Sequence, residues 1–358
     1  MSIVVFDEGY VERMWGGTKL RTVYGKETPM GQPIGEAWMI ADHPEHVSRV
    51  IGGRREGKTL RELMVSDAER LLGNLAKPTV HGRFPLLLKL LDAGDKLSIQ
   101  VHPTDGDAER LGEPDVGKTE MWHVLQADSD ADLYCGLGRE VDRKALAEIL
   151  AKGSIVEHMT TFPAEEGASI FVPAGTVHAI GGGSLLAEIQ QNSDITYRMD
   201  DWGRVQADGT AREMHVDKSL EVTAYGSLHQ GASNPIGYSS GSNTIAVHGV
   251  CDYFAGEVWT IGDSYVRESR GDSCFLLLGK ENVLTISAEG DSYSLKPGSA
   301  CLVEGCHQSF SVSGAGELLA YYVPDIQKDV VEPLLGAGHS AENIVRLGGD
   351  PGTSAIQV

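Results

Sequence analysis

The sequence predicts a mainly β protein with a few short helices. Outside the few expected helices, the sequence is characterised by short apolar segments separated by turn residues, and the 44 glycines fit many tight turns. Only a few segments have the periodicity of an amphipathic helix. The length exceeds one typical domain of roughly 100–200 residues, so we expect two domains.

Helices are expected at three places. Over residues 59–72, leucines and a methionine recur at helical spacing, and Thr59 with Glu62 has the pattern of a capping box. Residues 143–152 lie between an aspartate and a glycine, which are typical start and stop residues. Residues 216–225 end before a glycine and form the third expected helix.

Strands are expected where short apolar segments alternate with turn signals. They cover residues 84–91, 97–102, 120–126, 168–174, 184–190, 258–261, 274–279, 283–287, 300–305 and 318–324.

The domain boundary is expected in a polar, Gly/Ser/Asn-rich stretch at residues 226–243. We therefore expect a first domain at 1–228 that carries the short helices and a second β domain at 229–324. The remainder, 325–358, is interpreted as a loosely attached tail.

Composition excludes several classes of partner. The chain carries 30 Lys and Arg against 51 Asp and Glu, a net charge of −21, without a basic cluster. Nucleic acids and anionic membrane surfaces are therefore poor candidate partners. Five scattered cysteines and an acidic N-terminal segment indicate a reducing, cytoplasmic location. We expect a monomer or a weak homodimer.

The expected strand 97–102 has one polar face. Alternation places Ser98, Gln100 and His102 on that face and apolar residues on the other. The polar face either lines a cavity or is exposed to solvent on a half-buried strand.

A turn motif favours the cavity. Residues 167–178 read GASIFVPAGTVH, with the form G-x5-P-x-G-x2-H, which matches the second cupin motif. Cupins are jelly-roll barrels whose interior can hold a metal. The Pro–Gly turn would aim His178 inward from the strand that follows. The C-terminal strands are expected to form a second barrel without metal, because their corresponding segment, PGSACLVEGCHQSF, lacks the P-x-G-x2-H form.

A carboxylate between these segments would complete a ligand set. Glu120 shares a face with Lys118 and Trp122 in the segment DVGKTEMWHVL. A Lys–Glu surface pair is the alternative interpretation. With His102, His178 and the Gln100 amide, however, Glu120 would suit zinc or a neighbouring divalent ion.

Several blocks resemble the type I mannose-6-phosphate isomerases of the short bacterial kind. The resemblance covers residues 11–226 well and is general beyond them. The matching blocks are WGGTKL (15–20), GEAW (35–38), FPLLLKLLDAGDKLSIQVHP (84–103), GKTEMWHVL (117–125) and FVPAGTVHAIGGGSLLAEIQQNSDITYRMDDWGR (171–204).

The resemblance implies one zinc ion per chain, with Gln100, His102, Glu120 and His178 as its ligands. It also implies a sugar-phosphate substrate and further site residues. These are Arg198, Lys118 and Glu188 as catalytic residues, and Lys89, Ser98 and Arg204 as substrate-binding residues.

The implied reaction interconverts mannose 6-phosphate and fructose 6-phosphate through an enediol or enediolate, with Arg198 stabilising the enediolate or the phosphate. Lys118, Glu188 or a metal-held hydroxide remain alternatives for the general base. Two other classes fit parts of the pattern: a metal-dependent cupin dioxygenase and a non-catalytic sugar-binding cupin.

Overall fold

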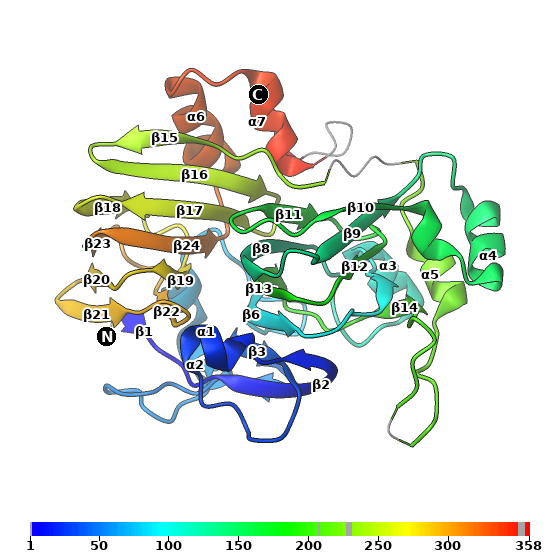
Figure 1. Cartoon of the computed structure of the whole chain (residues 1–358). Coiled ribbons are helices and arrows are strands. Elements are labelled where there is room, and N and C mark those ends of the chain that lie inside the picture. The colour runs from blue at the N-terminus through cyan, green and yellow to red at the C-terminus, as the bar shows by residue number, and fades with distance from the viewer. Residues whose placement is uncertain (1, 207, 227–230, 350–354) are drawn as a thin grey trace. The chain divides into compact units, whose positions relative to one another are not determined.

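The computed structural model describes residues 2–206, 208–226, 231–349 and 355–358. The predicted fold class is confirmed: within these residues the chain forms 24 strands and seven α-helices, so it is mainly β (Figure 1). The arrangement as two barrels stays a prediction.

The chain divides into two compact units. One, here called the central unit, comprises residues 10–37 and 90–232; the other, the C-terminal unit, comprises 1–9, 38–89 and 233–358. The sequence had suggested a single domain for 1–228, whereas two N-terminal segments group with the C-terminal residues. Residues 227–230, where the boundary was expected, lie outside the described residues.

Two sheets contain the strands of the central unit. The five-stranded sheet has the order β10 (Met159–Pro163), β9 (Asp132–Leu137), β12 (His178–Ile180), β7 (Ile99–Val101), β14 (Tyr197–Asp200). The six-stranded sheet has the order β11 (Ser169–Val172), β8 (Glu120–Ala127), β13 (Ser184–Gln191), β6 (Leu86–Ala93), β2 (Gly9–Gly17), β3 (Ile34–Ile40). In β2, β3 and β6 the chain passes from one unit to the other.

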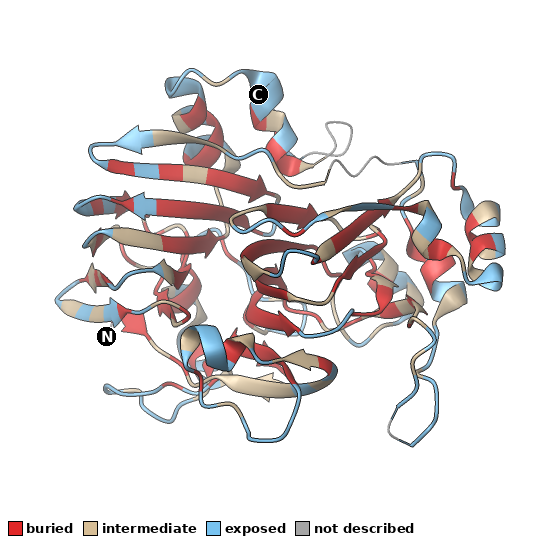
Figure 2. Cartoon of the chain, viewed as in Figure 1, coloured by how far each residue is buried: buried red, intermediate tan, exposed pale blue. Residues whose placement is uncertain are grey.

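The register of these sheets aligns the predicted site residues. Gln100 is paired with His178 on one side and with Arg198 on the other. Directly paired residues project to the same face of a sheet, so these three side chains share a face. In the six-stranded sheet Glu188 is paired with Trp122, which shares its face with Glu120 two residues earlier. Strands β8 and β13 are buried along most of their length (Figure 2).

The C-terminal unit is built on three further sheets, whose described strands pair antiparallel. The largest has the order β1 (Ile3–Val4), β22 (Ala300–Val303), β19 (Phe275–Glu281), β24 (Gly316–Tyr322), β17 (Ala255–Ile261), β16 (Asn243–Val250), β15 (Ile236–Ser240). The others are β18 (Ser264–Glu268), β23 (Ser309–Ser313), β20 (Leu284–Ala288), β21 (Asp291–Leu295), and the pair β4 (Asp42–His43), β5 (His46–Val47).

The three predicted helices are confirmed. Helix α2 (Leu60–Leu72) begins after Thr59, whose side chain forms the predicted capping box with Glu62. Helix α4 (Arg143–Lys152) begins after an aspartate cap and ends at a left-handed glycine. Helix α5 (Val216–Val222) is three residues shorter than predicted. Two short helices of the central unit were not predicted, α1 (Lys19–Tyr24) and α3 (Asp105–Leu111), together with the 3₁₀ turn η1 (Ile155–His158).

The prediction of a loosely attached tail after residue 324 is wrong for its described part. Val330, Leu334 and Ile344 are fully buried and belong to the apolar core of the C-terminal unit. In Figure 1 the helices α6 and α7 lie beside β15 and β16. The elements of this segment are the π-helix η2 (Ile326–Val331), α6 (Glu332–Gly336), α7 (Ala341–Val345) and the 3₁₀ turn η3 (Arg346–Gly348).

Among the helices that the structure describes, none is long and apolar enough to cross a membrane.

Candidate metal centre

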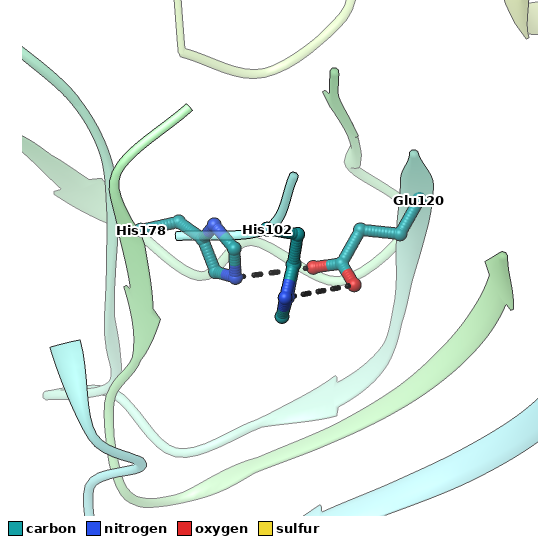
Figure 3. Close-up of side chains that lie close together, drawn as sticks. All are labelled: His102, Glu120 and His178. Atoms are coloured by element: carbon teal, nitrogen blue, oxygen red, sulfur yellow. Dashed lines mark ion pairs between the residues drawn. The ribbon is translucent and has the colours of Figure 1, made fainter. Parts of the chain in front are cut away.

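Three of the four predicted metal ligands have donor atoms close enough together to hold one ion. His102, Glu120 and His178 each place a donor atom within 4.8 Å of the others, and all three side chains are buried (Figure 3). His178 Nε2 lies 3.3 Å from Glu120 Oε1, and His102 Nε2 lies 3.5 Å from Glu120 Oε2. His102 directly follows β7, Glu120 is the first residue of β8, and His178 is the first residue of β12.

Backbone carbonyls fix the orientation of both imidazoles. His102 Nδ1 lies 2.7 Å from the carbonyl oxygen of Ile195, and His178 Nδ1 lies 2.8 Å from that of Thr176. A carbonyl only accepts hydrogen bonds, so both Nδ1 atoms must donate. The Nε2 atoms of the neutral rings are then left as electron-pair donors that face Glu120.

The fourth predicted ligand, Gln100, lies at the same place. Its side-chain amide Nε2 is 3.3 Å from His178 Nε2 and 3.5 Å from His102 Nε2. A 180° rotation of the amide would exchange that nitrogen for the oxygen, which is the atom that binds metals. Ser98, the predicted substrate-binding residue on the same strand, donates its hydroxyl to Gln100 Oε1 at 3.2 Å.

This donor set fits a divalent ion. Four ligand atoms placed tetrahedrally at about 2.0–2.2 Å from a zinc ion are separated from one another by roughly 3.3–3.6 Å. The Nε2 atoms of His102 and His178 lie 3.5 and 3.3 Å from the two oxygens of the Glu120 carboxylate, which is within that range. Two imidazoles, one carboxylate and an amide oxygen also match the ligand preference of zinc and its neighbours.

Lys118 and Glu188 lie beside this group. Lys118 Nζ forms an ion pair with Glu120 Oε2 at 2.7 Å and lies 3.3 Å from His102 Nε2, and Glu188 Oε1 is 4.0 Å away. Burial lowers the pKa of the Lys118 ammonium, but the Glu120 and Glu188 carboxylates outweigh burial and raise that pKa above its usual value. The Lys118 side chain is only 6% exposed, so its ion pair with Glu120 is buried and is not the surface pair that the sequence left as an alternative.

Arg198 is placed next to Gln100 by the register of β14 and β7. Its Nη1 donates a hydrogen bond of 2.9 Å to the carbonyl oxygen of Glu213, and its backbone N–H donates to His215 Nδ1 at 3.1 Å. Burial lowers the pKa of the Arg198 guanidinium from its usual value. Its role toward a substrate stays a prediction.

The other two predicted substrate-binding residues have structural contacts of their own. Arg204 forms an ion pair with Asp201 at 2.6 Å and also donates to the carbonyl oxygen of Lys96. Lys89 belongs to the C-terminal unit, where it is buried with its Nζ 4.6 Å from the centre of the Trp38 ring. Their contacts with a substrate stay predictions.

Sequence reasoning placed Trp122 on the face of Glu120 but gave it no role. In the structure its indole N–H contacts two carboxylates, Glu120 and Glu188. The signal available in the sequence was the Glu-x-Trp spacing, which puts both side chains on one face of a strand.

A second group with metal-ligand chemistry occurs in the C-terminal unit, at Glu304, Cys306 and His307. Here both carboxylate oxygens of Glu304 are paired with arginines, with Arg55 Nη1 at 2.5 Å and Arg70 Nε at 2.9 Å. Two guanidinium groups already neutralise this carboxylate and repel a further cation, so this group fits a metal ion less well than the first.

Comparisons with known proteins agree with these observations. The family model for the catalytic domain of type I phosphomannose isomerase matches residues 3–122. The mannose-6-phosphate isomerase of Streptococcus mutans is 33% identical over 86% of this chain and 94% of its own length. The mannose-6-phosphate isomerase ManA of Bacillus subtilis is 40% identical over 61% of this chain and 66% of its own.

A solved structure extends the similarity to the fold. The crystal structure of mannose 6-phosphate isomerase from Bacillus subtilis superposes with a TM-score of 0.81 at 29% identity, covering 90% of this chain and 99% of the other.

Proposed function

The chain belongs to the type I mannose-6-phosphate isomerase family, and we propose that it interconverts mannose 6-phosphate and fructose 6-phosphate. The observation that carries this proposal, besides the relatives, is the buried group of His102, Glu120 and His178 with Lys118 and Glu188 beside it.

The reaction moves a hydrogen between C1 and C2 of the sugar. It requires removal of a proton from a carbon next to a carbonyl group, which produces a high-energy enediolate. Residues that place positive charge near the developing oxyanion lower this barrier, because fixed charges in a buried site need no reorganisation.

We assign the metal site to Gln100, His102, Glu120 and His178, with one zinc ion per chain. A divalent ion held there would supply positive charge to the two adjacent substrate oxygens. The carbonyl-bound Nδ1 atoms of both histidines support this assignment, because they hold the rings with Nε2 toward Glu120.

Two groups are assigned to proton transfer. Glu188 is a carboxylate that can accept a proton from carbon, and the Lys118 ammonium can donate one from its Nζ. Both are buried beside the proposed ligands. Glu188→Gln and Lys118→Met distinguish them: the variant of the proton-transfer group retains zinc and substrate binding but loses exchange of the C2 hydrogen with solvent.

The net charge of −21 does not attract a sugar phosphate, so the attraction must be local. We assign it to Arg198, whose guanidinium suits either the phosphate or the enediolate. Lys89, Ser98 and Arg204 are assigned to the substrate as well. The cytoplasmic location and the monomeric or weakly dimeric state stay predictions.

A coupled assay of mannose 6-phosphate isomerisation with and without a chelator tests the proposal. We expect turnover that is lost on chelation and restored by zinc. Sugar-phosphate binding that survives chelation, without interconversion, would favour a non-catalytic sugar-binding cupin. Iron in the purified protein together with oxygen uptake would favour a dioxygenase.

A further inference from the structure

The carboxylate of Glu120 is contacted by a residue outside the proposed ligand set. The indole N–H of Trp122 lies 3.0 Å from Glu120 Oε1 and 3.2 Å from Glu188 Oε2, so one donor is shared between two acidic side chains. The same ring forms a T-shaped contact with the His178 imidazole, with ring centres 5.4 Å apart. Trp122 therefore contacts two of the four proposed ligands, Glu120 and His178.

The position of the indole is fixed by its surroundings. Trp122 has no exposed surface and belongs to an apolar cluster with Val124, Ile170 and Leu186. The side chain has two torsions, both restrained by this packing, so its N–H points in one direction. A buried indole N–H requires an acceptor, and the two carboxylates provide it.

Glu120 needs such a donor because its terminal torsion has a broad preference. Lys118 contacts Oε2, but an ammonium on a flexible four-carbon stem defines the carboxylate plane only loosely. Trp122 holds Oε1, the oxygen that lies 3.3 Å from His178 Nε2. The rigid donor thus sets how this oxygen faces the histidine.

The same local arrangement occurs in the C-terminal unit. Trp259 donates its indole N–H to Glu257 Oε2 at 2.6 Å, again two residues apart on one strand, and both residues are buried. No cluster of metal-ligating residues that the structure describes includes Glu257. This pair is a matched control that has the hydrogen bond without the histidines.

We propose that Trp122 is a positioning residue for the metal site: its N–H orients the Glu120 carboxylate for the ion and links it to Glu188. The proposal rests on the metal site proposed above. Partners that orient metal ligands typically change metal affinity by about 10–100-fold when they are removed.

The test compares Trp122→Phe with Trp259→Phe, which both keep an aromatic ring and remove the N–H. Zinc affinity is measured by competition with a chromophoric chelator, and the melting temperature is measured on the metal-free proteins. We expect zinc affinity about 10–100-fold weaker in Trp122→Phe and unchanged in Trp259→Phe.

A purely structural role for Trp122 would lower the melting temperature and leave zinc affinity within twofold of the wild type, which would overturn the proposal. An equal loss of affinity in both variants would also overturn it. If Trp122→Phe does not fold, benzothienylalanine at position 122 replaces the N–H by sulfur at nearly the same volume and decides in the same way.

His178→Ala separates this inference from the proposed function. If zinc affinity is the same in the wild type and in His178→Ala, the metal site itself is wrong. If His178→Ala loses zinc and Trp122→Phe does not, only the inference about Trp122 fails.

Discussion

Two buried glutamates in this chain each accept a hydrogen bond from a tryptophan, but their other contacts differ. Glu120 in the central unit and Glu257 in the C-terminal unit each accept the indole N–H of a tryptophan two residues later. Glu120 faces the imidazoles of His102 and His178. Glu257 instead accepts the hydroxyl of Tyr322 at 2.7 Å and lies in the electrostatic field of Arg267.

The difference shows how one local arrangement serves two purposes. Burial raises the pKa of Glu257, and the Arg267 guanidinium opposes that rise by providing a permanent positive charge. Around Glu120 the two imidazoles direct their Nε2 atoms at the carboxylate, and Lys118 supplies the positive charge that pairs with it. A carboxylate with an arginine is therefore structural, whereas one with two histidines can bind a metal.

Replacing each glutamate by glutamine should have the largest effect and tests whether the two sites differ as described. Glu120→Gln should lose zinc and lower kcat/KM by about 10³-fold, roughly 4 kcal/mol, because the negatively charged ligand is gone. Glu257→Gln should keep both the zinc and the kcat/KM of the wild type. Metal content and the coupled assay measure this, and equal effects at the two positions would contradict the distinction.

Removing the positive charge of Arg267 tests whether this arginine stabilises the C-terminal unit. Arg267 is buried, pairs with Asp329 at 3.0 Å, and lies 5.0 Å from the Tyr322 ring centre. Arg267→Met leaves buried carboxylates with fewer partners, so we expect a loss of about 3–5 kcal/mol in the free energy of unfolding. Urea unfolding measures the loss, with zinc content as the control; a change below 1 kcal/mol would mean that the guanidinium is dispensable.

Arg198 provides the corresponding test in the central unit. Arg198→Ala should lower kcat/KM by about 10²–10³-fold, the usual cost of one preorganised donor, and should leave zinc content unchanged. Arg198→Lys keeps the charge but not the planar guanidinium, so we expect partial activity. Turnover near the wild-type level in Arg198→Ala would refute the assignment.

A pH titration of stability tests a buried histidine of the C-terminal unit. Burial, the largest cause, lowers the pKa of His248 from 6.5 to about 4. The unfolded chain takes up a proton near pH 6.5 and the folded chain only near pH 4, so stability falls as pH decreases through this interval. The expected loss is about 3 kcal/mol by pH 4, and it is absent above pH 7.5.

Urea unfolding at several pH values, in wild type and His248→Gln, isolates this contribution. The variant should have a flatter dependence of stability on pH between 4 and 6.5. The same dependence in both proteins would show that other groups are responsible.

Local patterns in the sequence identified the three residues whose donor atoms the structure brings together, His102, Glu120 and His178. Alternation along residues 97–102 placed Gln100 and His102 on one face, and the Pro–Gly turn placed His178 on the next strand. The position of Arg198 beside Gln100 could not be read in this way, because it depends on the pairing of β14 with β7 across about 100 residues of sequence. The backbone carbonyls that orient the two histidines could not be predicted either, because they belong to Ile195 and Thr176, which have no distinguishing side-chain pattern.

Long-range packing also explains the errors in the fold. Strand β1 pairs with β22, with Ile3 opposite Val303, so the N-terminus joins the C-terminal unit through a contact that no local pattern encodes. The segment after residue 324 has short apolar patches, which suggested a loose tail. Their burial against strands such as β16 appears only in the folded chain.

Anomalous diffraction at the zinc absorption edge, from crystals of the purified protein, tests the central claim most directly. We expect one strong peak per chain in the central unit, within about 2.0–2.3 Å of His102 Nε2, His178 Nε2, a Glu120 oxygen and the Gln100 amide oxygen. A zinc-loaded crystal with no peak there, or with its peak at Glu304, Cys306 and His307 instead, would contradict the account.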